Sequence, residues 1–185
     1  MQRSLQTWEG APVEVVYRAF LLNPSIPPEG YPFAEYMHAK GGGRVPLEEF
    51  FDGPRQMGAA VGLVFNFDQI TKAPNSLKSH ALINLAPEGV RDAVIEDVYA
   101  AYFEFGQDIG DLETLLAIGE RHGMDRADLR VRLEAGEGEA QAEADAQWAA
   151  AHGIKGVPFF VIDGKYAFSG AQPPEVIQSF LARVK

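Results

Sequence analysis

The side chains that could perform chemistry in this 185-residue sequence are few, and cysteine is not among them. Without cysteine there is no thiolate nucleophile, no disulfide framework and no thiolate ligand for a metal ion. The four histidines are His38, His80, His122 and His152, and none has the spacing from a carboxylate or another histidine that is typical of a metal site. We therefore expect no metal and no catalytic thiol within these residues.

Three of the histidines have a simple structural interpretation. His122 and His152 each precede a glycine that could end a helix, Gly123 and Gly153. A cationic imidazole there would interact favourably with the helix C-terminus. His38 falls near the end of another predicted helix. We expect all three to be structural or surface residues.

The composition limits the classes of partner. The formal net charge is -10, and the isoelectric point is about 4.8. Nucleic acids and anionic membrane surfaces attract clustered Lys and Arg, so neither partner is expected. No apolar run approaches the roughly 20 residues that span a bilayer. The first five residues do not resemble a secretory signal, and we therefore expect a cytoplasmic protein.

The N-terminal segment predicts a short helix followed by a strand. Residues 2–8 could form two helical turns that end at Gly10. Residues 13–22 are rich in β-branched, aromatic and aliphatic side chains, with only Glu14 and Arg18 charged. This pattern is typical of a strand buried in a parallel sheet. Asn23 and Pro24 would end it in a loop.

Residues 33–152 predict a block of helices. The clearest covers residues 87–105, where Val90, Val94, Val98 and Ala101 form one apolar stripe. Asp111 has the position of an N-cap for a helix that ends at His122, and Asp125 has that position for the next helix.

The last predicted helix of the block covers residues 139–152. Its apolar face would carry Ala140, Ala144, Trp148 and Ala151. Its acidic residues, Asp145 among them, are expected on a solvated face.

The C-terminal residues change to a period of two. Residues 159–162 and 165–169 flank Asp163 and Gly164, a preferred two-residue hairpin turn. A helix follows, with Pro174 in its first turn and an apolar stripe on one side. The element order is therefore helix, strand, helices, hairpin and helix, which predicts an α/β fold with a large helical insertion.

Residues 153–175 carry the motif by which the chain resembles a known family. They read GIKGVPFFVIDGKYAFSGAQPPE, which is similar to FrnE-like members of the DsbA family of thioredoxin-fold oxidoreductases. Residues 20–24, 73–76 and 101–103 agree with this resemblance. It implies a thioredoxin-like core, residues 1–32 and 153–185, interrupted by a helical domain, residues 33–152. It also implies thiol-disulfide oxidoreductase or protein disulfide isomerase activity.

The usual start of such proteins is missing. The family has a first strand that leads into a Cys-Pro-x-Cys motif at a helix N-terminus, whereas Met1 would fall inside that helix. We therefore expect the natural reading frame to extend upstream. In the family this strand lies between the second strand and the hairpin, so its absence would leave a slot of roughly 9–10 Å in the sheet. The chain itself should be inactive in thiol exchange.

The resemblance also implies a set of substrate-binding residues. The Val157-Pro158 bond would be cis, and the backbone of Val157, beside Gly156, would pair with an extended substrate. Asn75 and His80 could border the same cleft. A purely structural role for His80, and a trans proline that opens a strand, are the alternatives.

Two other functions remain open at this point. One is a glutathione-dependent 2-hydroxychromene-2-carboxylate isomerase or transferase, in which glutathione is the cofactor and a serine replaces the thiol. Ser4 lies too far along its helix to match that serine. The other is a non-catalytic peptide-binding module. Partners would be thiol- or disulfide-containing proteins or small molecules, and two chains could pair as a homodimer to bury the sheet edges.

Overall fold

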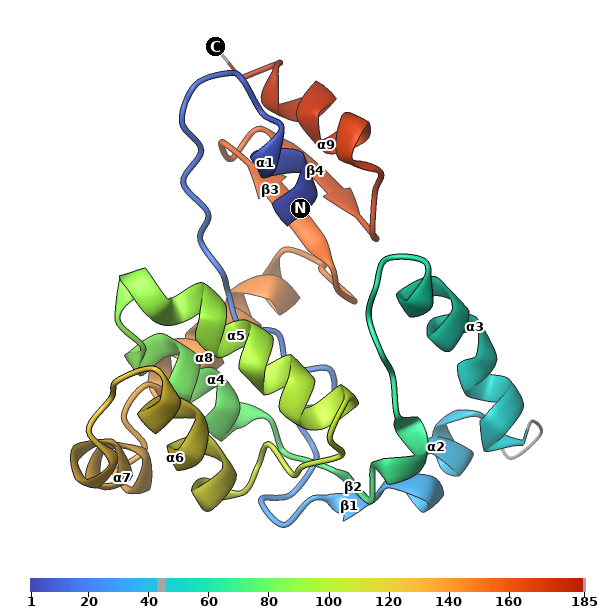
Figure 1. Ribbon diagram of the computed structural model, residues 1–185, viewed down its shortest axis with the longest axis vertical. Coiled ribbons are helices and arrows are strands. Elements are labelled where there is room, and N and C mark those ends of the chain that lie inside the picture. Colours follow the sequence, from blue (N-terminus) through green and yellow to red (C-terminus); the bar gives the residue numbers. More distant parts are fainter. Residues whose placement is uncertain (43–45, 185) are drawn as a thin grey trace. The chain divides into compact units, whose positions relative to one another are not determined.

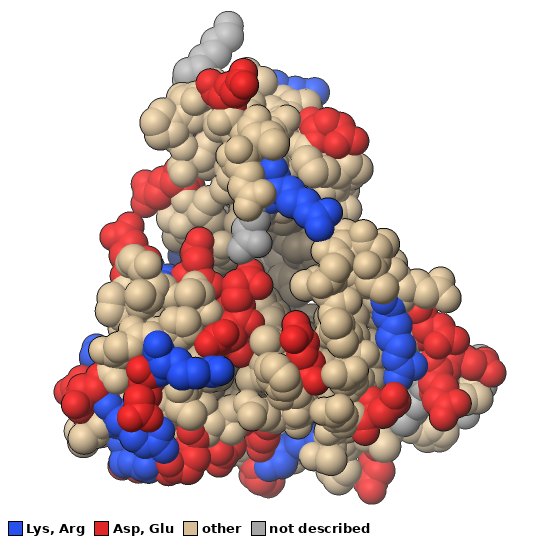
Figure 2. Space-filling model, in the orientation of Figure 1, with Lys and Arg blue, Asp and Glu red and all other residues tan. Residues whose placement is uncertain are grey.

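The computed structural model describes residues 1–42 and 46–184, which form two compact units. Unit 1 comprises residues 1–22 and 145–185, and unit 2 comprises residues 23–144. No helix in the described part of the chain is both long and apolar enough to cross a membrane. On the face drawn in Figure 2, acidic side chains are widely spread and basic side chains lie among them.

Unit 1 contains a hairpin and short helices. Its elements are α1 (Gln2–Gln6), the end of α8 (Glu139–Ala151), β3 (Phe159–Ile162), β4 (Tyr166–Ser169) and α9 (Pro174–Leu181). In Figure 1, α1 and α9 lie together beside the hairpin. Gln178 on α9 donates from Nε2 to the carbonyl oxygen of Ser4 at 2.9 Å and to Thr7 Oγ1 at 2.9 Å, which ties α9 to the N-terminal segment.

The predicted hairpin is confirmed, and stacked aromatic rings attach it to α9. Asp163 and Gly164 both have positive φ, 52° and 64°, as the turn requires. Antiparallel pairing begins with Ile162 opposite Tyr166. The ring centroids of Phe160 and Phe168, on neighbouring strands, are 4.8 Å apart. A second contact of 4.8 Å joins Phe168 to Phe180 on α9.

The strand predicted for residues 13–22 is not formed, and this prediction is wrong. Within the described residues these positions belong to neither sheet, because β3 pairs only with β4 and β1 only with β2. Most side chains of residues 13–18 are exposed or half-buried, and Ala19 is buried. A strand is defined by its ladder to a neighbour, and no such neighbour lies beside this segment in the described residues.

Unit 2 contains the helical block. Its elements are β1 (Tyr31–Pro32), α2 (Phe33–Lys40), α3 (Leu47–Ala59), the 3-10 turn η1 (Phe67–Gln69), β2 (Lys72–Ala73), α4 (Leu77–Leu85), α5 (Glu88–Phe103), α6 (Leu112–Arg121) and α7 (Arg126–Glu134), followed by the start of α8. β1 and β2 form a minimal antiparallel pair. As Figure 1 shows, α4 packs against α5, α6 and α7.

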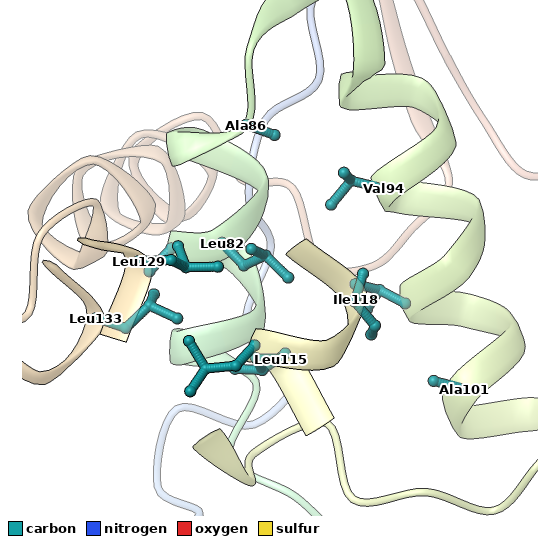
Figure 3. Packing of buried hydrophobic residues seen from close by; sticks show 11 residues of the cluster. Leu82, Ala86, Val94, Ala101, Leu115, Ile118, Leu129 and Leu133 are labelled. Carbon is teal, nitrogen blue, oxygen red and sulfur yellow. The ribbon is translucent and has the colours of Figure 1, made fainter. Parts of the chain in front are cut away.

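The main hydrophobic core lies among those four helices. Figure 3 shows Leu82, Leu115, Ile118, Leu129 and Leu133 converging between them, each at most 1% exposed. A second cluster joins α2, α3 and η1 through stacked aromatic rings. Phe51 is central to it, 5.7 Å from Phe33 and 4.1 Å from Phe67 between ring centroids.

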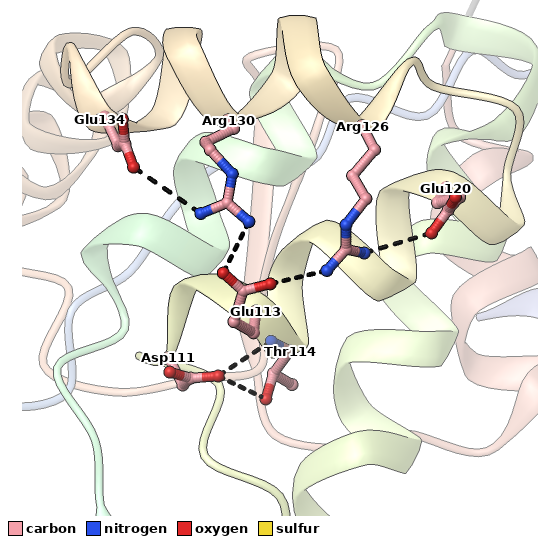
Figure 4. A network of polar contacts seen from close by, with 7 residues as sticks. All are labelled: Asp111, Glu113, Thr114, Glu120, Arg126, Arg130 and Glu134. Atoms are coloured by element: carbon pink, nitrogen blue, oxygen red, sulfur yellow. Dashed lines mark hydrogen bonds and ion pairs between the residues drawn. The ribbon is translucent and has the colours of Figure 1, made fainter.

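Helix ends in unit 2 follow the predicted caps. Asp111 Oδ2 accepts from the Thr114 backbone N–H at 2.9 Å, and Asp125 Oδ1 accepts from that of Asp128 at 2.8 Å. Both caps satisfy backbone donors that the helix leaves free. Figure 4 shows Glu113, one residue into α6, binding two arginines of α7: Arg126 at 2.6 Å and Arg130 at 2.6 Å.

The two units divide at residues 22/23 and 144/145, whereas the sequence places the boundaries at 32/33 and 152/153. Residues 23–32 join unit 2 through side-chain contacts. Asn75 Nδ2 donates to the carbonyl oxygen of Ile26 at 2.6 Å, and Asn23 Nδ2 donates to Tyr36 Oη at 3.2 Å. Asp145 belongs to unit 1 because it binds Arg18 and Ala19.

Candidate functional site

Three of the predicted site residues lie together in the loop between α8 and β3. Gly153 ends α8 with φ 70°, and Ile154 N–H donates to the carbonyl oxygen of Ala149 at 2.9 Å. The chain then reaches Gly156, Val157 and Pro158. The Val157-Pro158 peptide bond is cis, the geometry that the resemblance implies. Val157 is 52% exposed.

A hydrogen bond fixes this loop to the open end of the hairpin, opposite its turn. Gly170 N–H, just after β4, donates to the carbonyl oxygen of Pro158 at 2.8 Å. Pro158 is thereby held at the entry to β3, while Val157 remains exposed. An extended polypeptide could add its own backbone hydrogen bonds at this position.

A pocket of about 420 Å³ opens beside this loop, and its lining comes entirely from unit 1. Its size is within the range of about 300–1,000 Å³ usual for ligand sites. One wall is the extended segment 14–20, which contributes Glu14, Val16, Arg18, Ala19 and Phe20. β3 and the residues before it contribute Ile154, Val157, Phe159 and Val161. Asp145, Trp148 and Ala149 of α8 complete it.

A buried carboxylate joins the first wall to α8. Asp145 is 4% exposed, and its two oxygens accept from different groups. Arg18 Nη1 donates to Oδ1 at 2.7 Å, and the Ala19 backbone N–H donates to Oδ2 at 3.1 Å. The guanidinium of Arg18 also lies 5.6 Å from the ring centroid of Trp148, a cation–π contact. Asp145 therefore holds residues 18 and 19 against α8.

Sequence reasoning missed this cluster and assigned the wrong face of α8 to the interior. Ala140, Ala144, Trp148 and Ala151, the predicted apolar face, are exposed. The buried positions are Ala142, Asp145 and Ala149. These three residues also have helical spacing, and the two alanines among them were the sequence signal that could have predicted the buried face. The burial of Asp145 depends on Arg18 and Ala19, 127 and 126 residues away.

The other two predicted site residues lie in unit 2, where Asn75 has a structural role. Its Oδ1 accepts from the Leu77 backbone N–H at 2.9 Å at the start of α4, while Nδ2 holds Ile26. His80 is half-buried on the same helix. Nearby, Lys72 Nζ lies 2.7 Å from Asp108 Oδ2, and this hydrogen bond raises the pKa of Lys72. The assignment of Asn75 and His80 to a substrate cleft stays a prediction.

Within residues 1–42 and 46–184, no three histidine or acidic side chains gather where they could hold a metal ion. The 185-residue sequence contains no cysteine. Ser4 is fully buried in α1 and its hydroxyl has no hydrogen-bond partner, but it does not line the pocket. The site therefore offers backbone groups and apolar surface rather than a nucleophile.

Unit 1 contains a hairpin that follows a cis-proline and packs against a helix, and the helical block of unit 2 interrupts unit 1 in the sequence. This arrangement is that of a thioredoxin-like domain with an insertion. The DSBA-like thioredoxin domain matches residues 1–182, so the chain belongs to the DsbA-like thioredoxin family. The solved structure of a probable DsbA oxidoreductase from Streptomyces coelicolor is similar, with a TM-score of 0.85 and 30% sequence identity. The match covers 98% of this chain and 80% of that one. No curated protein sequence matches.

Proposed function

We propose that this chain is the substrate-binding scaffold of a FrnE-like thiol-disulfide oxidoreductase that acts in the cytoplasm. The observation that carries the proposal is that Val157, which precedes Pro158, is exposed and lines a pocket in a DsbA-like domain. The similar structure from Streptomyces coelicolor is described as a probable DsbA oxidoreductase, which supports the same chemistry. An extended polypeptide that carries a thiol or a disulfide would pair with the backbone of Val157.

The exchange itself needs thiols from outside these 185 residues. One thiolate attacks a substrate disulfide to form a mixed disulfide and releases the other substrate sulfur as a thiolate. A second thiol then attacks the mixed disulfide and releases the substrate. The scaffold would align the extended substrate for both steps. The chain alone should therefore neither oxidise nor reduce a disulfide.

The test is an intact-mass measurement of the endogenous protein, with thiols counted by alkylation before and after reduction. A mass above 20.2 kDa with two redox-active thiols would support the proposal. As a functional control, the 185-residue chain should give no disulfide reduction without added thiol. An endogenous protein of 20.2 kDa without thiols, or activity of the cysteine-free chain, would refute the oxidoreductase assignment.

The complete lack of cysteine favours one second candidate, a non-catalytic peptide-binding module. The exposed edge at Val157 would then serve binding alone. A thiol-free endogenous protein that still binds an extended peptide at this edge would support this function. Failure to bind any extended peptide would exclude it.

A further inference from the structure

One side of α3, in unit 2, carries a row of exposed apolar side chains. Phe50, Pro54 and Met57 are three or four residues apart, so they share one face of the helix. Val61 continues this spacing just beyond the end of α3. Phe50 is 40% exposed, Met57 69% and Val61 47%, and Pro54 is exposed as well. We call these four residues the α3 stripe.

A neighbouring side of the same helix is already packed within unit 2. Phe51 is buried in the aromatic cluster, where its ring stacks on those of Phe33 and Phe67. Gly58 is also buried, and a side chain at this position would meet the ring of Phe65. One apolar side is enough to attach a surface helix to its own domain. The α3 stripe is therefore a second apolar side, additional to the one that holds α3 in place.

The turn after α3 extends this apolar surface. Leu63 is 47% exposed and Val64 55% exposed. The Leu63 backbone N–H donates to the carbonyl oxygen of Gly58 at 2.9 Å, which folds the turn back onto the end of the helix. In Figure 1, α3 lies apart from the helices of the main core and packs against α2. Exposed apolar side chains gathered in this way mark an interaction surface.

The charged side chains of α3 are mostly acidic. Glu48, Glu49 and Asp52 are exposed, and Arg55 is the one basic residue in the sequence of this helix. Arg55 lies 2.8 Å from Asp68 Oδ1 and 3.8 Å from Asp52 Oδ1, so two carboxylates share its charge. The surroundings of the α3 stripe therefore have a net negative charge, which favours a basic partner.

We propose that the α3 stripe is the docking surface for a basic amphipathic helix of a partner protein. Side chains spaced by three and four residues form a ridge, which packs between the side-chain rows of a second helix. The stripe is about 17 Å long, so the partner would present about three helical turns. Its apolar side would cover Met57, and Lys or Arg on its flank would face Glu49 and Asp52.

The charge of the whole chain argues for a different protein rather than a second copy as the partner. Each copy has a formal net charge of -10, and two copies joined along this helix would bring their acidic side chains together. The proposal depends on neither the pocket of unit 1 nor thiol chemistry. It can therefore fail or succeed independently of the proposed function.

Three designed peptides test the chemistry of the partner. The probe is a fluorescein-labelled peptide of about 14 residues, with leucine at helical spacing on one face and lysine on its flanks. One control peptide has glutamate in place of lysine. The other has the residues of the probe in alternating apolar and polar order, which favours an extended strand. Fluorescence anisotropy with the 185-residue chain should show saturable binding of the probe, and at least about tenfold weaker binding of each control.

Substitutions locate the binding on the α3 stripe. Met57→Asn should weaken probe binding at least about tenfold, because docking would desolvate the amide in place of an apolar side chain. Val131→Asn is the matched control, since Val131 is 66% exposed on α7, and it should leave binding unchanged. Glu49→Lys should weaken binding of the lysine probe and strengthen binding of the glutamate control. Far-UV circular dichroism checks that each variant is folded.

Every other outcome overturns the proposal. No saturable binding, or equal weakening by Met57→Asn and Val131→Asn, would mean that the α3 stripe does not dock such a helix. Equal binding of the alternating peptide would mean that the partner segment is extended, and equal binding of the glutamate peptide would mean that basic residues are not recognised. A concentration-dependent dimer that Met57→Asn dissociates, without probe binding, would identify a second copy of the chain as the partner.

Discussion

Replacing Asp145 with alanine should selectively destabilise unit 1. The change removes the acceptor of the buried Ala19 N–H and the partner of Arg18. An unsatisfied buried backbone donor costs about 1–3 kcal/mol. The ion pair adds no more than about 1 kcal/mol because Arg18 is half exposed. We expect a loss of about 1–4 kcal/mol, and a smaller loss for Asp145→Asn, which retains an acceptor.

The two tryptophans make this loss measurable in unit 1 alone. Trp8 and Trp148 both belong to unit 1, so tryptophan fluorescence reports its unfolding while far-UV circular dichroism is dominated by the helices of unit 2. With a urea m-value of roughly 1–1.5 kcal/mol/M, a loss of about 3 kcal/mol lowers the fluorescence midpoint by roughly 2–3 M. Trp148 also contacts Arg18, so only the midpoint and not the starting intensity should be compared.

A surface ion pair provides the control for this experiment. Asp68 binds Arg55 at 2.8 Å in unit 2, but its side chain is 80% exposed. Asp68→Ala should cost less than about 1 kcal/mol. If Asp145→Ala shifts the fluorescence midpoint no more than Asp68→Ala shifts the circular dichroism midpoint, the proposed role of Asp145 in unit 1 is refuted.

Three further predictions concern unit 2. Leu115→Ala should cost about 2–5 kcal/mol in urea unfolding followed by circular dichroism, because Leu115 is fully buried; an unchanged midpoint would contradict the packing in Figure 3. Hydrogen bonds from Arg130, then Arg126, lower the pKa of Glu113 below its ordinary 4.5. The ionised Glu113 carboxylate therefore stabilises the fold above about pH 4.5, and this stabilisation is lost as the pH falls through the lowered pKa. Glu113→Gln should make Tm depend less on pH in the acid range. Equal slopes of Tm against pH for the two proteins would contradict this role of Glu113. Burial raises the pKa of Tyr102 well above 10, so its ultraviolet titration should lag behind that of exposed tyrosines, and Tyr102→Phe should remove this late step but not an earlier one.

Local patterns predicted the features that depend only on neighbours in sequence. The caps at Asp111 and Asp125 and the turn at Asp163 and Gly164 were predicted because each needs only a few adjacent residues. The helix predicted over residues 87–105 is α5, Glu88–Phe103.

The features that depend on distant residues were not predicted correctly. Residues 13–22 have the composition of a buried strand, yet strand formation requires a neighbour that the described residues do not supply. Asp145 looked like a surface residue because its partners, Arg18 and Ala19, are remote in sequence. The pocket is lined by segments that are far apart in the sequence, so local patterns could not predict it.

The discontinuity of unit 1 also bears on the order in which the protein can fold. Residues 1–22 are synthesised before unit 2, but their contacts with residues 145–185 cannot form until those residues have also been synthesised. Unit 2 is continuous in sequence and can fold in the interval. Once folded, it replaces a long flexible loop with a fixed connection, which lowers the entropic cost of joining the two segments. Residues 1–22 are therefore synthesised long before they can reach their final contacts.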